Sequence, residues 1–247
     1  MPESFLILLC GGIMLAAALS DPQQVTLNWL RLCGILALAM AGVSMFFLFR
    51  RSEPVGATAC VVAACLFAAI LAQLALVQVS RRRLQQAFAW LAFFLAVKIG
   101  ADQTPADRII GYACALGVAA MTGLALMDML LGHAYLTASK MTIAPFARLN
   151  AFLAGTLVWR SILSIGVTML IVHFHPIYLL WGQHGPFILT RWLVGLFVPA
   201  VFIYMAHDCI RRRSTQSATG ILYVAGVLIF VGEIIALYLV RATGLPF

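Results

Sequence analysis

Four ionisable residues lie inside stretches that are otherwise apolar enough to cross a membrane: Asp128, Arg160, Arg191 and Glu233. An ionisable group in hydrocarbon is costly unless it is paired or faces water, so such residues mark functional sites by default. A carboxylate exchanges protons, and a guanidinium donates hydrogen bonds to a carbonyl oxygen. We take these four residues as the candidate catalytic set, acting either as a quinone and proton site or as buried ion pairs.

The depth of each residue in the membrane predicts its partner. Glu233 and Arg191 each lie twenty residues from the basic segment 211–213, which places both in the same outer leaflet. We therefore expect an Arg191–Glu233 ion pair between the last two spans. Asp128 and Arg160 each lie twelve residues from a basic loop residue, near the middle of the membrane, and could pair with each other. Buried ion pairs can also serve only to fix helix register, and the sequence leaves both interpretations open.

Two helical faces carry these charges. Polar residues recur every four positions in the sixth apolar stretch and predict a stripe that faces the bundle interior: Thr156, Arg160, Ser164 and Thr168. Helical spacing in the last stretch predicts an inward seam: Gln216, Thr219, Tyr223, Gly226, Phe230 and Glu233.

Two histidines lie near the same predicted membrane face. His133 and His207 fall at the C-terminal ends of two spans that run in the same direction, roughly 6–10 Å inside their loop boundaries at 1.5 Å per residue. Similar depth on two helices is the minimum requirement for a bis-histidine haem b, so both are candidate axial ligands. The alternative is that His207 only ends its helix, where cations suit the negative end of the dipole.

A second histidine group lies toward the opposite face. His173 ends the sixth span, and His175 and His184 fall in or beside a predicted loop over 176–186. These three side chains are candidate ligands for a metal ion or a second haem. The alternative is a polar rim at the membrane interface.

Composition predicts the environment of these residues. The 247-residue chain is 64% hydrophobic and only 10% charged, whereas a soluble domain carries about 25% charged residues. The long continuous apolar runs predict an all-α bundle of membrane helices rather than a β-barrel. The net charge of +8 comes from basic residues at the ends of these runs, which argues against a nucleic-acid partner. The six cysteines are scattered without a CxxC motif.

We predict eight spans in one transmembrane domain, 1–247. They cover 4–20, 27–49, 55–79, 86–101, 108–136, 147–174, 187–210 and 217–241. The first half, 1–101, has few strongly polar groups and is expected to be a packing scaffold, whereas 108–241 forms the functional half. An even number of spans places both termini on one side, and nine basic residues against five favour the outside for the termini.

The layout resembles two kinds of respiratory membrane anchor, in architecture rather than in any motif. Histidines near both faces are similar to diheme cytochrome b anchors, and eight spans with both termini outside are similar to the anchors of molybdenum-enzyme reductases. The resemblance implies an anchor subunit in a bacterial inner membrane that contacts lipid and other subunits and handles quinol or quinone, either with haem b or without haem. The alternatives are a transporter lined by the Arg160 stripe and a non-catalytic scaffold or assembly subunit. No phosphate-binding loop, HExxH or nucleophile elbow points to an autonomous enzyme.

Overall fold

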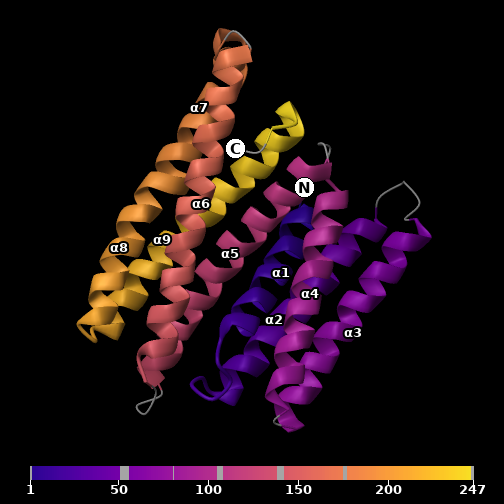
Figure 1. The fold of residues 1–247 in the computed structure, drawn as a ribbon, viewed down its shortest axis with the longest axis vertical. Helices are drawn as coiled ribbons and strands as arrows, with labels where there is room; N and C mark the ends of the chain where they lie inside the picture. The colour runs from indigo at the N-terminus through magenta and orange to yellow at the C-terminus, as the bar shows by residue number, and fades with distance from the viewer. Residues whose placement is uncertain are drawn as a thin grey trace.

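The computed structural model describes residues 2–50, 56–79, 81–104, 108–137, 142–174 and 177–245, and every regular element within these ranges is helical. Within these ranges, eight helices are long and apolar enough to cross a membrane, which confirms the predicted all-α bundle and indicates an integral membrane protein in contact with lipid (Figure 1). The elements are α1 Pro2–Leu19, α2 Leu27–Phe49, α3 Ala57–Val79, α4 Arg82–Asp102, α5 Arg108–Thr137, α6 Ala144–Phe174, α7 Ile177–Trp192, the π-helix η1 Leu193–Phe197, α8 Val198–Arg211 and α9 Thr215–Thr243.

The seventh span differs from the prediction. The predicted loop over 176–186 was wrong from residue 177 onward, because α7 begins at Ile177 and contains Pro186. A proline inside a helix removes one backbone donor, and α7 is held against α9 on both sides of it. His184 meets the Tyr238 ring edge-on, with 6.0 Å between ring centroids, and Ile188 packs beside Leu239. The span then continues through η1 into α8 without a break.

Helix α1 lies at the centre of the N-terminal half, where 78% of its most apolar window is buried. It packs against α2, α4 and α5. Its closest approach is to α5, since a Cβ on Gly12 would lie 1.9 Å from the carbonyl oxygen of Ala119. Small residues allow the two backbones to approach this closely. Such packing contacts hold helices together in a membrane, because lipid supplies no hydrophobic driving force between them.

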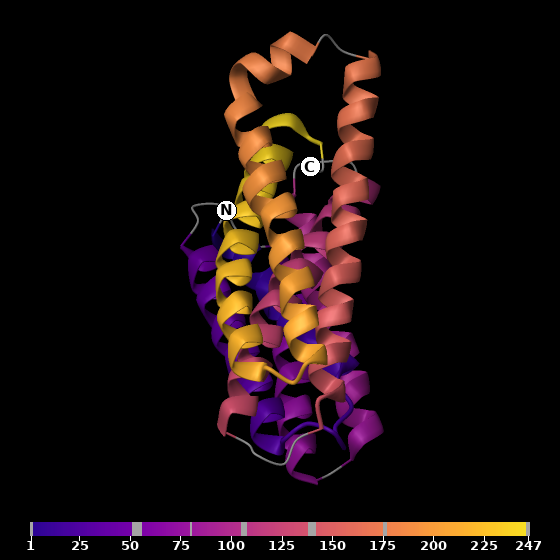
Figure 2. The same ribbon diagram turned by 90° about the vertical axis from the view of Figure 1, so that its left-hand side faces the viewer.

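Helix α5 joins the two halves of the molecule. The helices α1, α2 and α4 pack on it from the N-terminal half, and α6 and α9 pack on it from the C-terminal half. Helix α8 in turn packs against α9 and α6 (Figures 1 and 2). Because α5 contacts both halves, its inward residues can meet side chains from α6 and α9.

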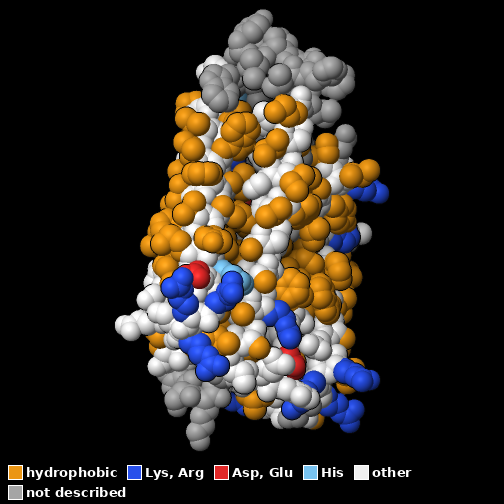
Figure 3. Space-filling view, turned by 60° about the vertical axis from the view of Figure 1, so that its left-hand side comes forward, with side chains coloured by type: hydrophobic (Ala, Val, Ile, Leu, Met, Phe, Trp, Pro, Cys, Tyr) orange, Lys and Arg blue, Asp and Glu red, His pale blue; other side chains and the backbone are white. Residues whose placement is uncertain are grey.

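Helix α6 is the least buried of the eight spans, with 22% of its window inside the bundle. Its outer face is a continuous apolar row that suits lipid: Phe152, Val158, Ile162, Ile165 and Met169. Figure 3 shows apolar side chains over the broad middle of one face of the molecule, with most Lys and Arg gathered toward its lower end. That separation is what a bilayer requires of the surface.

Both termini lie at the same end of the bundle (Figure 1). Arg241 Nη2 donates to Ser4 Oγ at 2.7 Å, and Ser4 Oγ donates to Gln103 Oε1 at 2.8 Å. These bonds tie α9, α1 and α4 together and agree with the predicted even number of spans.

Candidate functional site

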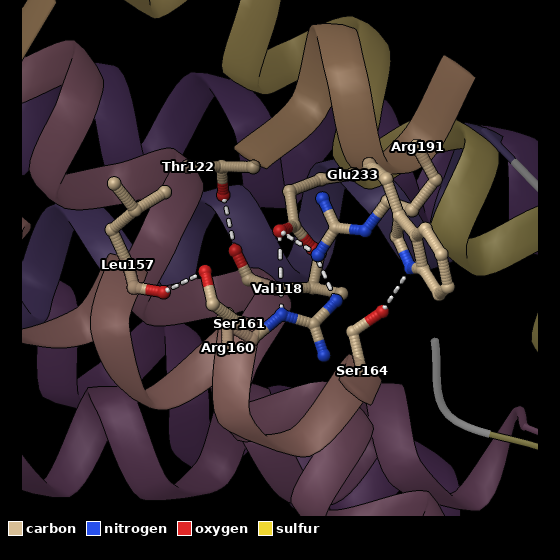
Figure 4. Close-up of polar contacts among 9 residues, drawn as sticks. Val118, Thr122, Leu157, Arg160, Ser161, Ser164, Arg191 and Glu233 are labelled. Carbon is tan, nitrogen blue, oxygen red and sulfur yellow. Dashed lines mark hydrogen bonds and ion pairs between the residues drawn. The ribbon is translucent and has the colours of Figure 1, made fainter. Parts of the chain in front are cut away.

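Three of the four predicted ionisable residues form one buried cluster (Figure 4). Arg160 of α6 donates two hydrogen bonds to the Glu233 carboxylate from one edge of its guanidinium group, Nη2 to Oε2 at 2.7 Å and Nε to Oε1 at 3.3 Å. Arg191 of α7 places Nη2 2.9 Å from Oε1 of the same carboxylate. All three side chains are 0% exposed. The predicted Arg191–Glu233 pair is therefore confirmed, and the three residues are called the arginine–glutamate cluster below.

The predicted pairing of Arg160 with Asp128 was wrong. Asp128 instead accepts a hydrogen bond from Asn150 Nδ2 at 2.9 Å, and we call these two residues the aspartate–asparagine pair. Arg160 lies level with Gly117 of α5, because a Cβ on Gly117 would fall 2.5 Å from Arg160 Cδ. Gly117 and Asp128 are eleven residues apart, about 16 Å along the helix. The prediction counted twelve residues from a basic loop residue on each helix. It failed because it assumed that these two loop residues lie at the same depth in the membrane.

Glycines on three elements make room for the two guanidinium groups. Gly117 lets the Arg160 side chain lie flat against α5. Gly195 of η1 and Gly232 of α9 bring their backbones together, since a Cβ on Gly232 would lie 2.3 Å from the Cα of Gly195 and 3.1 Å from Arg191 Nη1. The π-helix begins two residues after Arg191, and π-helical segments are frequent at functional sites.

Neighbouring polar groups belong only partly to the predicted stripe on α6. Ser164, one turn beyond Arg160, is buried and accepts a hydrogen bond from Trp192 Nε1 at 2.9 Å. Thr156 and Thr168 instead donate to carbonyls of their own helix, at 2.9 Å and 2.8 Å. The stripe therefore contributes Arg160 and Ser164 to the bundle interior, whereas its two threonines satisfy the α6 backbone.

The arginine–glutamate cluster has more donors than acceptors. Two guanidinium cations surround one carboxylate, so the cluster carries a surplus positive charge. Arg160 Nη1 and Arg191 Nε and Nη1 are buried without an acceptor in hydrogen-bond geometry, although the Cys114 thiol interacts with the Arg160 guanidinium. The Arg191 Nη2 contact with Glu233 is close in distance, but it lacks hydrogen-bond geometry. Unpartnered buried donors are costly, so this cluster suits a ligand that accepts hydrogen bonds.

The aspartate–asparagine pair has the opposite imbalance. Both side chains are 0% exposed, on α5 and α6. The single hydrogen bond between them leaves Asp128 Oδ1 and Asn150 Oδ1 without partners. One turn further along α5, Gly132 admits the Phe146 ring and the Thr219 hydroxyl. This pair suits a ligand that is positively charged or donates a hydrogen bond.

The two proposed haem ligands lie on helices α5 and α8. His133 is exposed on α5 and lines a groove against α2, together with Asn28 and Trp29. His207 is half-buried on α8, and α9 packs against both α5 and α8. A bis-histidine haem needs both imidazoles directed at one iron. Haem ligation by His133 and His207 stays a prediction.

The other three histidines do not form a described ligand set. His175 and the side chain of His173 lie outside the described residues. His184 packs against Tyr238, and its Nδ1 is buried without a hydrogen-bond partner. Within the described part of the chain, no group of three or more His, Cys, Asp or Glu side chains is placed to hold a metal ion.

Sequence reasoning missed three neighbours of these sites. Asn150 has a usable signal, since it is a strong hydrogen-bonding residue near the start of an apolar stretch. Trp192 directly follows Arg191, but a tryptophan in an apolar stretch is usually a packing residue. Cys114, three residues before Gly117, interacts with the Arg160 guanidinium. Nothing in the sequence distinguishes Cys114 from the five other scattered cysteines.

Comparisons with known proteins found no matching protein family, no similar curated protein and no similar solved structure.

Proposed function

We propose that the protein is an integral membrane subunit of an electron-transfer complex that binds quinone and quinol at the arginine–glutamate cluster. The observation that carries this proposal is the group of buried, unpartnered guanidinium N–H bonds on Arg160 and Arg191 beside the Glu233 carboxylate. A quinone site needs apolar walls, a donor for a carbonyl oxygen and a group that exchanges protons.

The residues match the chemistry of both redox forms. Reduction of a quinone takes two electrons and two protons and converts its carbonyls to hydroxyls. Arg160 and Arg191 can donate to a carbonyl oxygen and stabilise the negative charge that develops on it. When quinol is oxidised, its hydroxyl proton must be accepted, and Glu233 is the carboxylate within the cluster. The electrons are exchanged with a redox group on a partner subunit.

Access to the cluster requires α6 to move. The cluster is fully buried, and α6 contributes Arg160 to it and the neighbouring Ser164, which bonds to Trp192. Among the described elements, α6 packs chiefly on α5 and α8, and it is the least buried span. Displacement of α6 toward lipid would uncover the unpartnered N–H groups from the apolar side, where quinones dissolve.

Tryptophan fluorescence tests this proposal directly in the purified protein. Trp192 lies beside Arg191 and bonds to Ser164, so a short-chain quinone at the cluster should quench its emission. We expect saturable quenching that is lost in Trp192→Phe and retained in the control Trp90→Phe on α4. In Arg160→Gln, the quinone concentration that gives half-maximal quenching should rise at least about tenfold, which is equivalent to about 1.4 kcal/mol of binding free energy. Saturable quenching that survives Trp192→Phe, or no quenching at all, would remove quinone from this cluster and leave a scaffold role.

The predicted haem has a separate test. A visible spectrum of the dithionite-reduced complex should show a sharp b-type α-band if His133 and His207 act as axial ligands, and the band should vanish in either His→Ala variant. If the fully assembled complex lacks this band, quinone binding at the cluster stands without haem.

A further inference from the structure

We infer that the aspartate–asparagine pair is a proton-binding site, with the proton held on the Asp128 carboxyl group. This assignment concerns a different location from the proposed quinone site, about 16 Å away along α5 at 1.5 Å per residue. The binding of the proton does not depend on the quinone proposal. Only the role given to it below, as a proton store for quinone chemistry, rests on that proposal.

The hydrogen-bond count of the pair requires one more hydrogen. Asn150 Nδ2 donates to Asp128 Oδ2 at 2.9 Å. The two remaining side-chain oxygens, Asp128 Oδ1 and Asn150 Oδ1, are buried acceptors without donors. A carboxylate has acceptors alone, whereas a carboxylic acid adds one O–H donor. A proton on Asp128 therefore supplies the hydrogen that this pair lacks.

Among the described side chains, no cation contacts Asp128 to offset a negative charge. The described charged side chains of the helices that pack on α5 are engaged at other places or lie at the surface, and on α5 itself His133 is exposed. On α6, Arg148 is exposed and Arg160 belongs to the arginine–glutamate cluster. On α9, Glu233 belongs to that cluster, Arg241 bonds to Ser4, and Tyr223 and Tyr238 are the remaining titratable side chains. On α1, Glu3 lies close to Arg241, and Cys10 is a buried thiol.

The remaining neighbours of α5 give the same result. On α2, Arg31 is exposed and Cys33 is a buried thiol. On α4, Lys98 pairs with Asp102 at 2.7 Å, and Arg82 and Arg83 are exposed. An isolated carboxylate in an apolar interior is penalised so strongly that such groups neutralise by taking up a proton. The arrangement around Asp128 therefore favours the acid over the ion.

Asp128 lies nearer to the C-terminal end of α5 than to its start. Asp128 lies nine residues before the end of α5, about 14 Å from it. One turn toward that end, a Cβ on Gly132 would lie 2.6 Å from Thr219 Oγ1, so a hydroxyl stands beside this turn of α5. We place proton uptake from water at this end. Under the proposed function, Asp128 holds one of the two protons that quinone reduction consumes, and water at this end of the bundle replaces it.

Infrared difference spectroscopy of the purified full chain tests the proton assignment. The wild-type minus Asp128→Asn spectrum at neutral pH should contain the carbonyl stretch of a protonated carboxylic acid, and this band should shift in D2O. The band should persist in Glu233→Gln, which is the matched control for the other buried carboxylate. In Asn150→Leu it should move to higher frequency, because the hydrogen bond from the amide is lost.

Two results would overturn the assignment. Carboxylate bands in place of the acid band would show that Asp128 is ionised. Loss of the acid band on addition of sodium at constant pH would show a metal-cation site instead of a proton site. The Asn150→Leu spectrum decides the question independently if Asp128→Asn does not fold. Failure of quinone quenching at Trp192 would leave these results unchanged, so the two proposals fail separately.

Discussion

The arginine–glutamate cluster and the aspartate–asparagine pair are built from overlapping helices but have opposite deficits. Both draw on α5 and α6, through Gly117 and Arg160 in one and through Asp128 and Asn150 in the other. The cluster holds two cations, one anion and buried donors without acceptors. The pair holds one carboxyl group and buried acceptors without donors. The cluster lacks hydrogen-bond acceptors and the pair lacks hydrogen-bond donors. We therefore assign a ligand that accepts hydrogen bonds to the cluster and a proton to the pair.

The largest expected difference between the two sites is in stability. Glu233→Gln leaves two guanidinium cations buried without a counter-charge and should lower the free energy of unfolding by about 3–5 kcal/mol. Thermal unfolding of the detergent-solubilised protein measures this loss. Adding Arg191→Met to Glu233→Gln should recover part of it, because one uncompensated charge is removed. Equal stability of Glu233→Gln and Asp128→Asn would contradict the contrast between the sites.

The glycine contacts around the cluster give the next largest effect. Gly232→Ala should cost about 1–3 kcal/mol, the usual range for overpacking, because its Cβ would lie 2.3 Å from the Gly195 backbone. Gly226→Ala is the matched control on the same helix, since a Cβ there meets nothing within 4 Å. Gly226→Ala should be neutral or slightly stabilising, because alanine is the better helix former. Similar unfolding temperatures for the two variants would mean that the close contact between η1 and α9 does not hold Arg191 in place.

The fork of Arg160 predicts a smaller and more specific effect. Arg160→Lys keeps the positive charge but cannot bind both carboxylate oxygens in the same plane. We expect the quinone affinity measured by Trp192 quenching to fall about three- to tenfold, which corresponds to about 0.7–1.4 kcal/mol. The loss of stability should be smaller than in Glu233→Gln. An affinity in Arg160→Lys equal to that of the wild type would show that charge alone matters at this position.

The smallest expected stability change belongs to Asp128→Asn. An amide resembles a protonated carboxyl group in shape and lack of charge, so the unfolding free energy should change by less than about 1 kcal/mol, the scale of one neutral hydrogen bond. The dependence of stability on pH should flatten at the same time, because the variant has lost a group that gains or releases a proton. A loss as large as that of Glu233→Gln would contradict the contrast, because it would mean that Asp128, like Glu233, compensates a buried positive charge.

The sequence predicted the general fold and one of the two pairings. Continuous apolar stretches are sufficient to predict eight spans, because the bilayer imposes both their length and their helical conformation. The Arg191–Glu233 contact was predictable because both residues could be counted from the same short basic segment, 211–213. Two neighbouring helices joined by a short loop share a common reference for depth.

The position of Arg160 could not be obtained in the same way. Its level depends on how far α6 is displaced along α5, and that displacement follows from tertiary packing. Gly117 marks the level on α5 that Arg160 reaches, because only a residue without a side chain allows Arg160 to lie against α5. From sequence, Gly117 is one of 19 glycines, so it gives no usable signal by itself.

Photochemical labelling is the most direct test of quinone binding at the arginine–glutamate cluster. An azido-quinone is bound to the purified protein, activated with light, and its attachment sites are located by mass spectrometry of the fragments. The account predicts labelling on α6 near Ser164 and on α7 or η1 near Trp192, blocked by excess unlabelled quinone and strongly reduced in Arg160→Gln. Labelling confined to other helices, or labelling at these positions that Arg160→Gln leaves unchanged, would contradict it.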